Sequence, residues 1–88
     1  MFHRRSATQE QQESFGRVLR EARIQKNLTQ EELSERLSCS PHWINNIENG
    51  KSSPNWVDTI NLLIELELNP KSLAEEVGIL VPVPANRK

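Results

Sequence analysis

Apolar residues in the first part of this chain recur at helical spacing, in short blocks separated by polar turns. An amphipathic helix is predicted by residues at i, i+3, i+4 and i+7, which are Phe15, Val18, Leu19 and Ala22. We expect Ser14 to cap this helix and Asn27 to end it, because asparagine tolerates the left-handed conformation. Leu28 then returns to the core.

A capping box predicts a second, short helix. The Thr29 hydroxyl can accept a hydrogen bond from the backbone amide of Glu32, and the Glu32 carboxylate can reach back to the Thr29 amide. Leu33 and Leu37 form the apolar edge of this helix. Only residues 38–40 separate it from the next predicted helix, and two short helices joined by so tight a turn are typical of a helix-turn-helix.

A third helix is predicted over residues 41–49 by signals at both of its ends. Ser40 is a suitable N-cap, and Pro41 occupies the first helical position, where no N–H is needed. Gly50 can end the helix in a left-handed turn.

The two faces of this third helix differ in chemistry. Ile44 and Ile47 make one narrow apolar stripe, whereas His42, Asn45 and Asn46 lie on the other side. Asparagine can bond N6 and N7 of adenine together, and a helix fits the major groove of DNA. Two interpretations are open from these residues alone: a helix that contacts bases, and a short surface helix with solvated amides.

A fourth helix is predicted after a polar loop, with Asn55 as its N-cap. Several apolar side chains are expected to point from it into the core: Trp56, Ile60, Leu63 and either Ile64 or Leu66. Asn69 ends this helix, and Pro70 opens a fifth that stops at Gly78. The apolar residues 79–84 follow, and their prolines favour an extended conformation.

Length and composition indicate one small domain of the all-α class. The chain has 88 residues, of which 35% are hydrophobic and 26% charged, enough for one small core. We expect a flexible N-terminal arm at 1–13 with helical character near residues 8–14, a DNA-binding domain at 14–78 and an extended apolar tail at 79–88. No apolar run reaches the ~18 residues of a membrane span, and none follows the first charges as in a secretory signal, so a cytoplasmic protein without membrane contact is expected.

The charge balance neither favours nor excludes nucleic acid. The net charge of −1 counts against a simple basic domain, but residues 1–28 hold six basic and three acidic side chains, which permits a basic face. Enzymatic chemistry has little support. The two histidines belong to no catalytic or metal-ligand arrangement, the three glycines are isolated, and Cys39 is the only cysteine. We expect no catalytic residue, no metal, no cofactor and no small-molecule ligand.

Residues 15–73 resemble the Cro and phage-repressor type helix-turn-helix regulators, the XRE family. The resemblance is carried by the runs 28–33 (LTQEEL) and 47–51 (IENGK) at this separation. Further matching positions are Phe15, Gly16, Leu19, Arg20, Arg23, Leu37, Ser40, Ile44, Pro54 and 62–68. The resemblance implies a compact, lambda-repressor-like bundle of five helices, with the helix 41–49 in the major groove.

The resemblance also implies roles for single residues. The positions that face bases are Pro41, His42, Asn45 and Asn46. The positions that meet the DNA backbone are Gln30, Ser40, Trp43, Asn49 and Lys51. Arg23 and Glu48 would form a largely buried ion pair. The chain departs from the family at Ser38, where relatives usually have glycine, and at Pro41, where some have a glutamine that contacts bases.

These features predict a sequence-specific DNA-binding regulator, a repressor that binds double-stranded DNA at a palindromic operator as a homodimer. So small a core cannot also bury the apolar tail, so the fifth helix and the tail are expected to form the dimer interface. Its residues are Leu73, Ile79, Leu80, Val81 and Val83. The alternative is an antitoxin or adaptor whose main role is to bind a partner protein.

Overall fold

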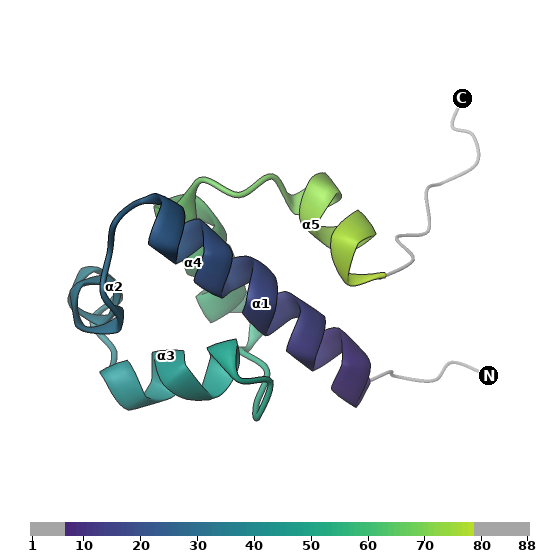
Figure 1. The fold of residues 1–88 in the computed structure, drawn as a ribbon, viewed down its shortest axis with the longest axis horizontal. Helices are drawn as coiled ribbons and strands as arrows, with labels where there is room; N and C mark the ends of the chain where they lie inside the picture. The colour runs from purple at the N-terminus through teal and green to yellow at the C-terminus, as the bar shows by residue number, and fades with distance from the viewer. Residues whose placement is uncertain (1–6, 79–88) are drawn as a thin grey trace.

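The computed structural model describes residues 7–78, which contain five α-helices and no β-strand (Figure 1). The helices are α1 (Gln9–Gln25), α2 (Gln30–Leu37), α3 (Pro41–Glu48), α4 (Trp56–Leu66) and α5 (Pro70–Val77). α1 contacts α3, α4 and α5, while α2 packs against α3 and α4. The all-α prediction is confirmed. None of the helices in this part of the chain has the length and apolar character needed to cross a membrane.

The first helix begins earlier than its apolar pattern predicts. Thr8 is its N-cap: the Thr8 hydroxyl accepts from the amide of Gln11 at 3.0 Å, and the Gln11 side chain accepts from the amide of Thr8 at 3.0 Å. The prediction that Ser14 caps this helix is therefore wrong, and residues 9–13 belong to α1, in agreement with the helical character expected near residues 8–14. Because these residues carry no apolar stripe, only the Thr-x-x-Gln capping box could have indicated them.

The hydrophobic core is formed by seven buried side chains from the first four helices and the loop after α1, namely Leu19, Leu28, Leu33, Ile44, Ile47, Leu62 and Leu66. Leu28 follows Asn27, whose φ of 59° is the left-handed conformation expected where α1 ends. The capping box at the start of α2 is also present, with Thr29 and Glu32 bonded in both directions at 2.8 and 3.0 Å.

The inward face of α4 differs from the prediction. Leu62 and Leu66 are buried, whereas Trp56 is 74% exposed and Ile64 is 69% exposed. Ile60 is also exposed, so two side chains expected in the core, Trp56 and Ile60, face outward, and of the pair Ile64 or Leu66 it is Leu66 that is buried. Apolar residues occupy most of the circumference of this helix, and periodicity alone therefore cannot select a face. Packing against α1 and α2 selects the side that carries Leu62 and Leu66.

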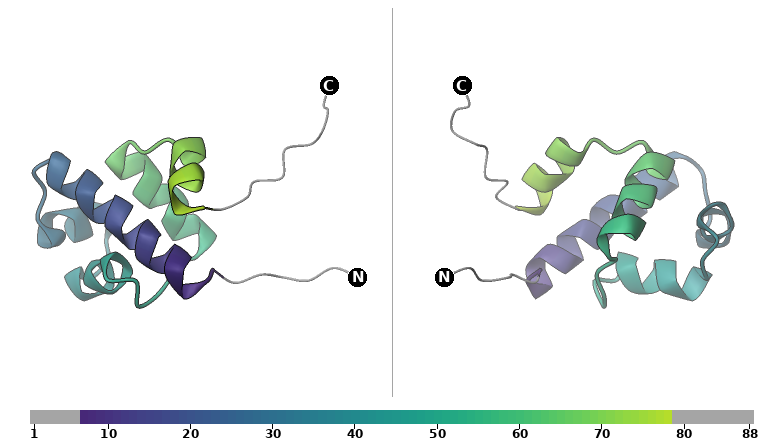
Figure 2. Two further views of the ribbon diagram at one scale, coloured as in Figure 1. Left: turned by 45° about the vertical axis from the view of Figure 1, so that its right-hand side comes forward. Right: turned by 180° about the vertical axis from the view of Figure 1, so that it is seen from behind.

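The fifth helix packs on α1 (Figure 2). Asn69 caps it by accepting from the amides of Lys71 and Ser72, and Gly78 ends it with a φ of 84°. Leu73 is only 7% exposed, so it has little surface to offer a second subunit, and its interface role stays a prediction. The other predicted interface residues, Ile79, Leu80, Val81 and Val83, lie outside the described residues.

Candidate nucleic-acid interface

The orientation of α3 is set by its two isoleucines. Ile44 and Ile47 are 2% and 1% exposed and hold one side of the helix in the core. His42 and Asn49 are exposed on the opposite side, with Asn46 partly exposed beside them. This side of the helix therefore presents a continuous row of polar side chains.

The start of α3 is built as its sequence predicts. The Ser40 hydroxyl accepts a hydrogen bond from the Trp43 amide at 3.1 Å, and Pro41 occupies the first turn. Ser38 adopts the left-handed conformation with φ 56° in the turn between α2 and α3. A serine pays a steric cost for this conformation that glycine avoids, yet the turn keeps its geometry. α2 and α3 pack directly against each other across the turn.

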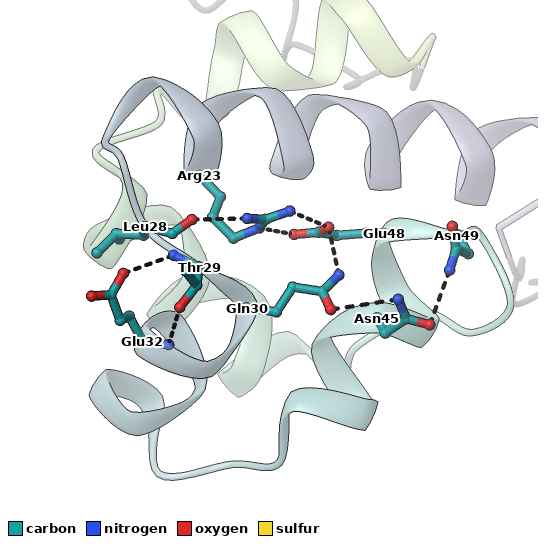
Figure 3. A network of polar contacts seen from close by, with 8 residues as sticks. All are labelled: Arg23, Leu28, Thr29, Gln30, Glu32, Asn45, Glu48 and Asn49. Atoms are coloured by element: carbon teal, nitrogen blue, oxygen red, sulfur yellow. Dashed lines mark hydrogen bonds and ion pairs between the residues drawn. The ribbon is translucent and has the colours of Figure 1, made fainter.

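A nearly buried ion pair joins α1 to the end of α3 (Figure 3). The side chains of Arg23 and Glu48 are 11% and 3% exposed, and this is the pair that the resemblance implies. In addition to its bonds to Glu48, Arg23 donates a hydrogen bond from Nη1 to the backbone carbonyl oxygen of Leu28 at 2.8 Å. Hydrogen bonding to the Glu48 carboxylate raises the pKa of Arg23 above its ordinary high value, outweighing the opposing effect of burial.

A chain of side-chain amides continues from this ion pair toward the surface (Figure 3). Gln30 Nε2 donates to Glu48 Oε1 at 3.0 Å, and Asn45 Nδ2 approaches Gln30 Oε1 at 3.5 Å. Asn49 Nδ2 then donates to Asn45 Oδ1 at 3.0 Å. One of the two amide protons of Gln30 is thus directed at Glu48, which leaves the other for a further acceptor.

His42 and Asn46 form a second polar group on the exposed side of α3. Asn46 Nδ2 lies 3.3 Å from His42 Nε2, one helical turn apart. In the tautomer that accepts at Nε2, this contact directs one amide proton of Asn46 toward the ring. The side-chain Oδ1 of Asn46 and the second proton on Nδ2 remain for another partner.

The chain was compared with known proteins. A family model described as a helix-turn-helix domain matches residues 16–80, well over half of the chain. The chain belongs to this helix-turn-helix family. The match is to an XRE-type domain, which agrees with the resemblance to Cro and phage-repressor type regulators, and it makes the protein a DNA-binding helix-turn-helix regulator. No curated protein and no solved structure matches the chain.

Not every predicted contact residue of the helix-turn-helix faces the same way. Trp43 is half-buried, packs against the core and lines a hollow between α3 and α4, so it lies at the flank of the exposed row. Lys51 is exposed just after α3, and its amide donates to the carbonyl oxygen of Asn46 at 2.9 Å. Among residues 7–78, no group of His, Cys, Asp or Glu side chains is placed to hold a metal ion.

Two glycines bring α1 into direct contact with the helix-turn-helix, a feature that the sequence analysis did not identify. A Cβ atom on Gly16 would lie 2.5 Å from the carbonyl oxygen of Glu48 and closer still to that of Ile47. A Cβ atom on Gly50 would lie 2.7 Å from Glu13 Cγ. An isolated glycine inside an amphipathic helix is the only sequence signal for this close approach.

Two arginines beside the end of α3 were also missed. Arg17 and Arg20 are exposed on α1 and line a shallow hollow together with Glu13, Glu48 and Asn49. Because Glu48 is engaged by Arg23, its carboxylate is already compensated. The two arginines therefore place positive charge close to Asn49, at the edge of the exposed row.

Proposed function

We propose that this protein is a transcriptional repressor that binds a palindromic operator as a homodimer, with α3 in the major groove. The observation that carries the proposal is the arrangement of α3. Ile44 and Ile47 hold one side in the core, while His42 and Asn46 occupy the exposed side of its first two turns. The N-terminal part of a recognition helix enters the groove most deeply.

The base contacts that we propose are Pro41, His42, Asn45 and Asn46. The side-chain Oδ1 of Asn46 and the second proton on its Nδ2 are not used in the contact with His42, which suits paired bonding to adenine N6 and N7. Pro41 cannot donate a hydrogen bond, and its exposed ring suits contact with a thymine methyl group. Asn45 is held by Gln30 and Asn49, so its amide is oriented before DNA binds.

Contacts to the DNA backbone would supply affinity without sequence information. The residues proposed for these contacts are Gln30, Ser40, Trp43, Asn49 and Lys51. Arg17 and Arg20 extend this set because they lie beside Asn49. The basic members of this set, Arg17, Arg20 and Lys51, would allow a chain of net charge −1 to attract phosphate.

Dimerisation follows from the small size of the reading surface. One α3 helix of eight residues can contact only a few base pairs. A two-fold pair doubles both the contacts and the length of the site, and its half-sites lie about 34 Å apart, one turn of DNA. We therefore expect a palindromic operator.

Selection of bound DNA from a random pool by the full chain tests this proposal. Enrichment of a palindrome with half-sites one helical turn apart is the expected result, and a pool that stays random after repeated rounds would contradict it. A reporter promoter that carries the selected site tests the direction of regulation. Repression requires lower reporter output when the protein is present, and higher output would make it an activator.

The alternative of an antitoxin or adaptor gives a different result in the same selection. That hypothesis assigns partner binding to residues 79–88, which lie outside the described residues. A pure adaptor would enrich no sequence, whereas an antitoxin that also regulates its own gene would enrich one. Co-purification of a stoichiometric partner protein with the tagged chain from its native cell would then favour the antitoxin.

A further inference from the structure

The exposed side of α4 carries an apolar stripe that is not covered by any other part of residues 7–78. Trp56, Ile60 and Ile64 follow one another at intervals of one helical turn, and Val57 lies beside them. Trp56 is 74% exposed and Ile64 is 69% exposed. Ile60 and Val57 are 45% and 46% exposed. Among residues 7–78, only one other large hydrophobic side chain is comparably exposed, Ile24 on α1.

This stripe is a fixed feature of the fold. Leu62 and Leu66 occupy the opposite side of α4 and are 1% and 3% exposed. Rotation of α4 to bury the stripe would bring these two leucines out of the core, so the core of residues 7–78 cannot bury both sides of α4. Contiguous apolar patches on a protein surface mark sites of interaction with another molecule.

We propose that the stripe Trp56, Val57, Ile60 and Ile64 is the contact surface for a second copy of this chain, with the two α4 helices side by side about a two-fold axis. This inference rests on the proposed function, because it assigns the interface of the proposed homodimer. It replaces Leu73, which is buried within the monomer, as the contribution of the described residues to that interface.

The charges near the stripe are compatible with a copy of the same surface. Glu65 is bonded to Arg36 at 3.0 Å, and Glu67 is bonded to Lys26 at 3.0 Å. Both carboxylates are thus compensated within their own chain. A two-fold contact therefore does not place these acidic groups against each other without counter-charges, a juxtaposition that would oppose association.

The shape of this surface also suits a self-contact. A hollow of about 250 Å³ lies beside α4, with Trp43 on one wall and Asp58 and Asn61 on the other. At about 3.6 residues per turn, Asn61 and Trp56 fall on opposite edges of the stripe. A two-fold axis roughly parallel to α4 therefore sets the Trp56 edge of one copy against the hollow of the other, where Asp58 offers an acceptor for the indole N–H.

The position of α4 links this contact to the DNA-binding surface. α4 begins close to where α3 ends, after a short loop (Figure 2). None of the stripe residues lies on α3, so pairing through α4 leaves the exposed row on α3 uncovered. An axis roughly along α4 also places both α3 helices on the same side of the dimer, as two half-sites on one face of DNA require.

The size of the stripe indicates a weak dimer. It consists of four side chains, and burial of even a tryptophan removes only ~150–250 Å² from water. Stable interfaces bury about 800 Å² on each partner, so this contact falls in the range of weak, concentration-dependent association. Two adjacent half-sites on DNA would raise the effective concentration of one copy near the other and strengthen it.

Analytical ultracentrifugation of the full chain over a wide concentration range tests this proposal. We expect a reversible monomer–dimer equilibrium whose dissociation constant rises at least tenfold in both Trp56→Glu and Ile64→Glu. Ser72→Glu, which adds the same charge at an exposed site on α5, should leave the constant unchanged. Circular dichroism must show that each variant is folded, which the exposure of these side chains leads us to expect.

The apolar tail 79–88 is the alternative dimer interface, and a substitution in it distinguishes the tail from the stripe. If Leu80→Asp in the full chain abolished the dimer while Trp56→Glu did not, the interface would be the tail and the proposal would fail.

A second readout uses Trp43→Phe, which leaves Trp56 as the only tryptophan. Its fluorescence should shift to shorter wavelength as the dimer forms, and an unchanged spectrum across the transition would exclude Trp56 from the interface.

Failure of the α4 interface and failure of the proposed DNA-binding function give different experimental results. A protein that stays monomeric at all concentrations and on a selected two-fold site overturns this inference, although single half-site binding would still support base contacts by α3. A dimer sensitive to Trp56→Glu that enriches no DNA sequence would leave this inference standing and overturn the proposed function.

Discussion

Arg23 donates two hydrogen bonds to Glu48, from Nε to Oε2 at 2.6 Å and from Nη2 to Oε1 at 3.0 Å. Glu48 also accepts from Gln30, so one carboxylate at the end of α3 is bonded to both α1 and α2. Its side chain is only 3% exposed. The orientation of the helix-turn-helix relative to α1 therefore depends on a charged pair that is almost removed from water.

Removal of Glu48 should destabilise the protein strongly. Glu48→Ala leaves the Arg23 guanidinium nearly buried without its counter-charge, and the loss of one partner of a buried pair costs ~3–5 kcal/mol. For a domain of this size, each 1 kcal/mol lowers the melting temperature by about 4–8 °C. Thermal unfolding followed by circular dichroism measures the change.

Glu35→Ala is the matched control for this prediction. Glu35 lies on the exposed side of α2, and the substitution removes the same number of atoms and the same charge. We expect a change of at most ~0.5 kcal/mol. Similar melting temperatures for the two variants would show that the pair contributes little to stability.

Gly16→Ala tests the close approach of α1 to α3. The new methyl group would meet the backbone carbonyls of Ile47 and Glu48, which cannot move as a side-chain end can. Overpacking of this kind costs ~1–3 kcal/mol or more, and any relief must shift α3 relative to α1. We expect lower stability in urea and weaker binding to the selected operator.

Gly78→Ala separates steric contact from backbone strain. A Cβ atom at this position meets nothing within 4 Å, so the only cost comes from its φ of +84°. That cost is about 1 kcal/mol, with no effect on operator binding. Equal losses of DNA affinity in Gly16→Ala and Gly78→Ala would contradict a positioning role for Gly16.

The reactivity of Cys39 follows from its environment. Burial raises the pKa of the Cys39 thiol, with a further contribution from the negative charge of Asp58. A raised pKa means less thiolate at pH 8 than in an unfolded chain, and the thiolate is the reactive form. Alkylation by iodoacetamide should be several-fold slower in the native protein than in denaturant. The contribution of Cys39 to the free energy of unfolding should be lost only as the pH rises from the pKa of an unfolded cysteine through the raised pKa of the native thiol.

The parts of the fold that were predicted correctly depend on local chemistry. Ser40, Thr29 and Asn55 cap helices because their side-chain oxygens reach amides two or three residues away, and such bonds need no tertiary structure. The Arg23 and Glu48 pairing joins distant helices, and only the family resemblance indicated it. The polar residues of α3 were found because two isoleucines leave only one possible inward side.

The parts that were not predicted depend on packing between elements. Either side of α4 could have been buried according to periodicity, and the contacts with α1 and α2 decide for Leu62 and Leu66. The contact of Gly16 with the backbone of α3 could not be predicted from the sequence, because the approach of two backbones depends on tertiary packing. The burial of Leu73 in the monomer was not foreseen for the same reason, since packing of α5 against α1 cannot be read from an apolar residue alone.

Substitutions in α3 and in the following loop should separate base contacts from phosphate contacts. Asn46 lies on the exposed side of α3 beside His42, whereas Lys51 lies beyond the helix end. Asn46→Ala should relax the preference at one base pair of each half-site, worth ~1–3 kcal/mol of discrimination, and leave the salt dependence nearly unchanged. Lys51→Ala should weaken binding to every sequence alike.

Binding measured by fluorescence anisotropy at several salt concentrations distinguishes the two effects. Loss of one phosphate contact flattens the slope of log K against log salt by about 1 for each half-site, because one fewer counterion is released. Each variant is measured on the selected operator and on scrambled DNA of the same length. If Asn46→Ala kept the wild-type ratio between these two affinities, Asn46 would not contact a base. The sequence preference would then have to come from Pro41, His42, Asn45 or the shape of the DNA.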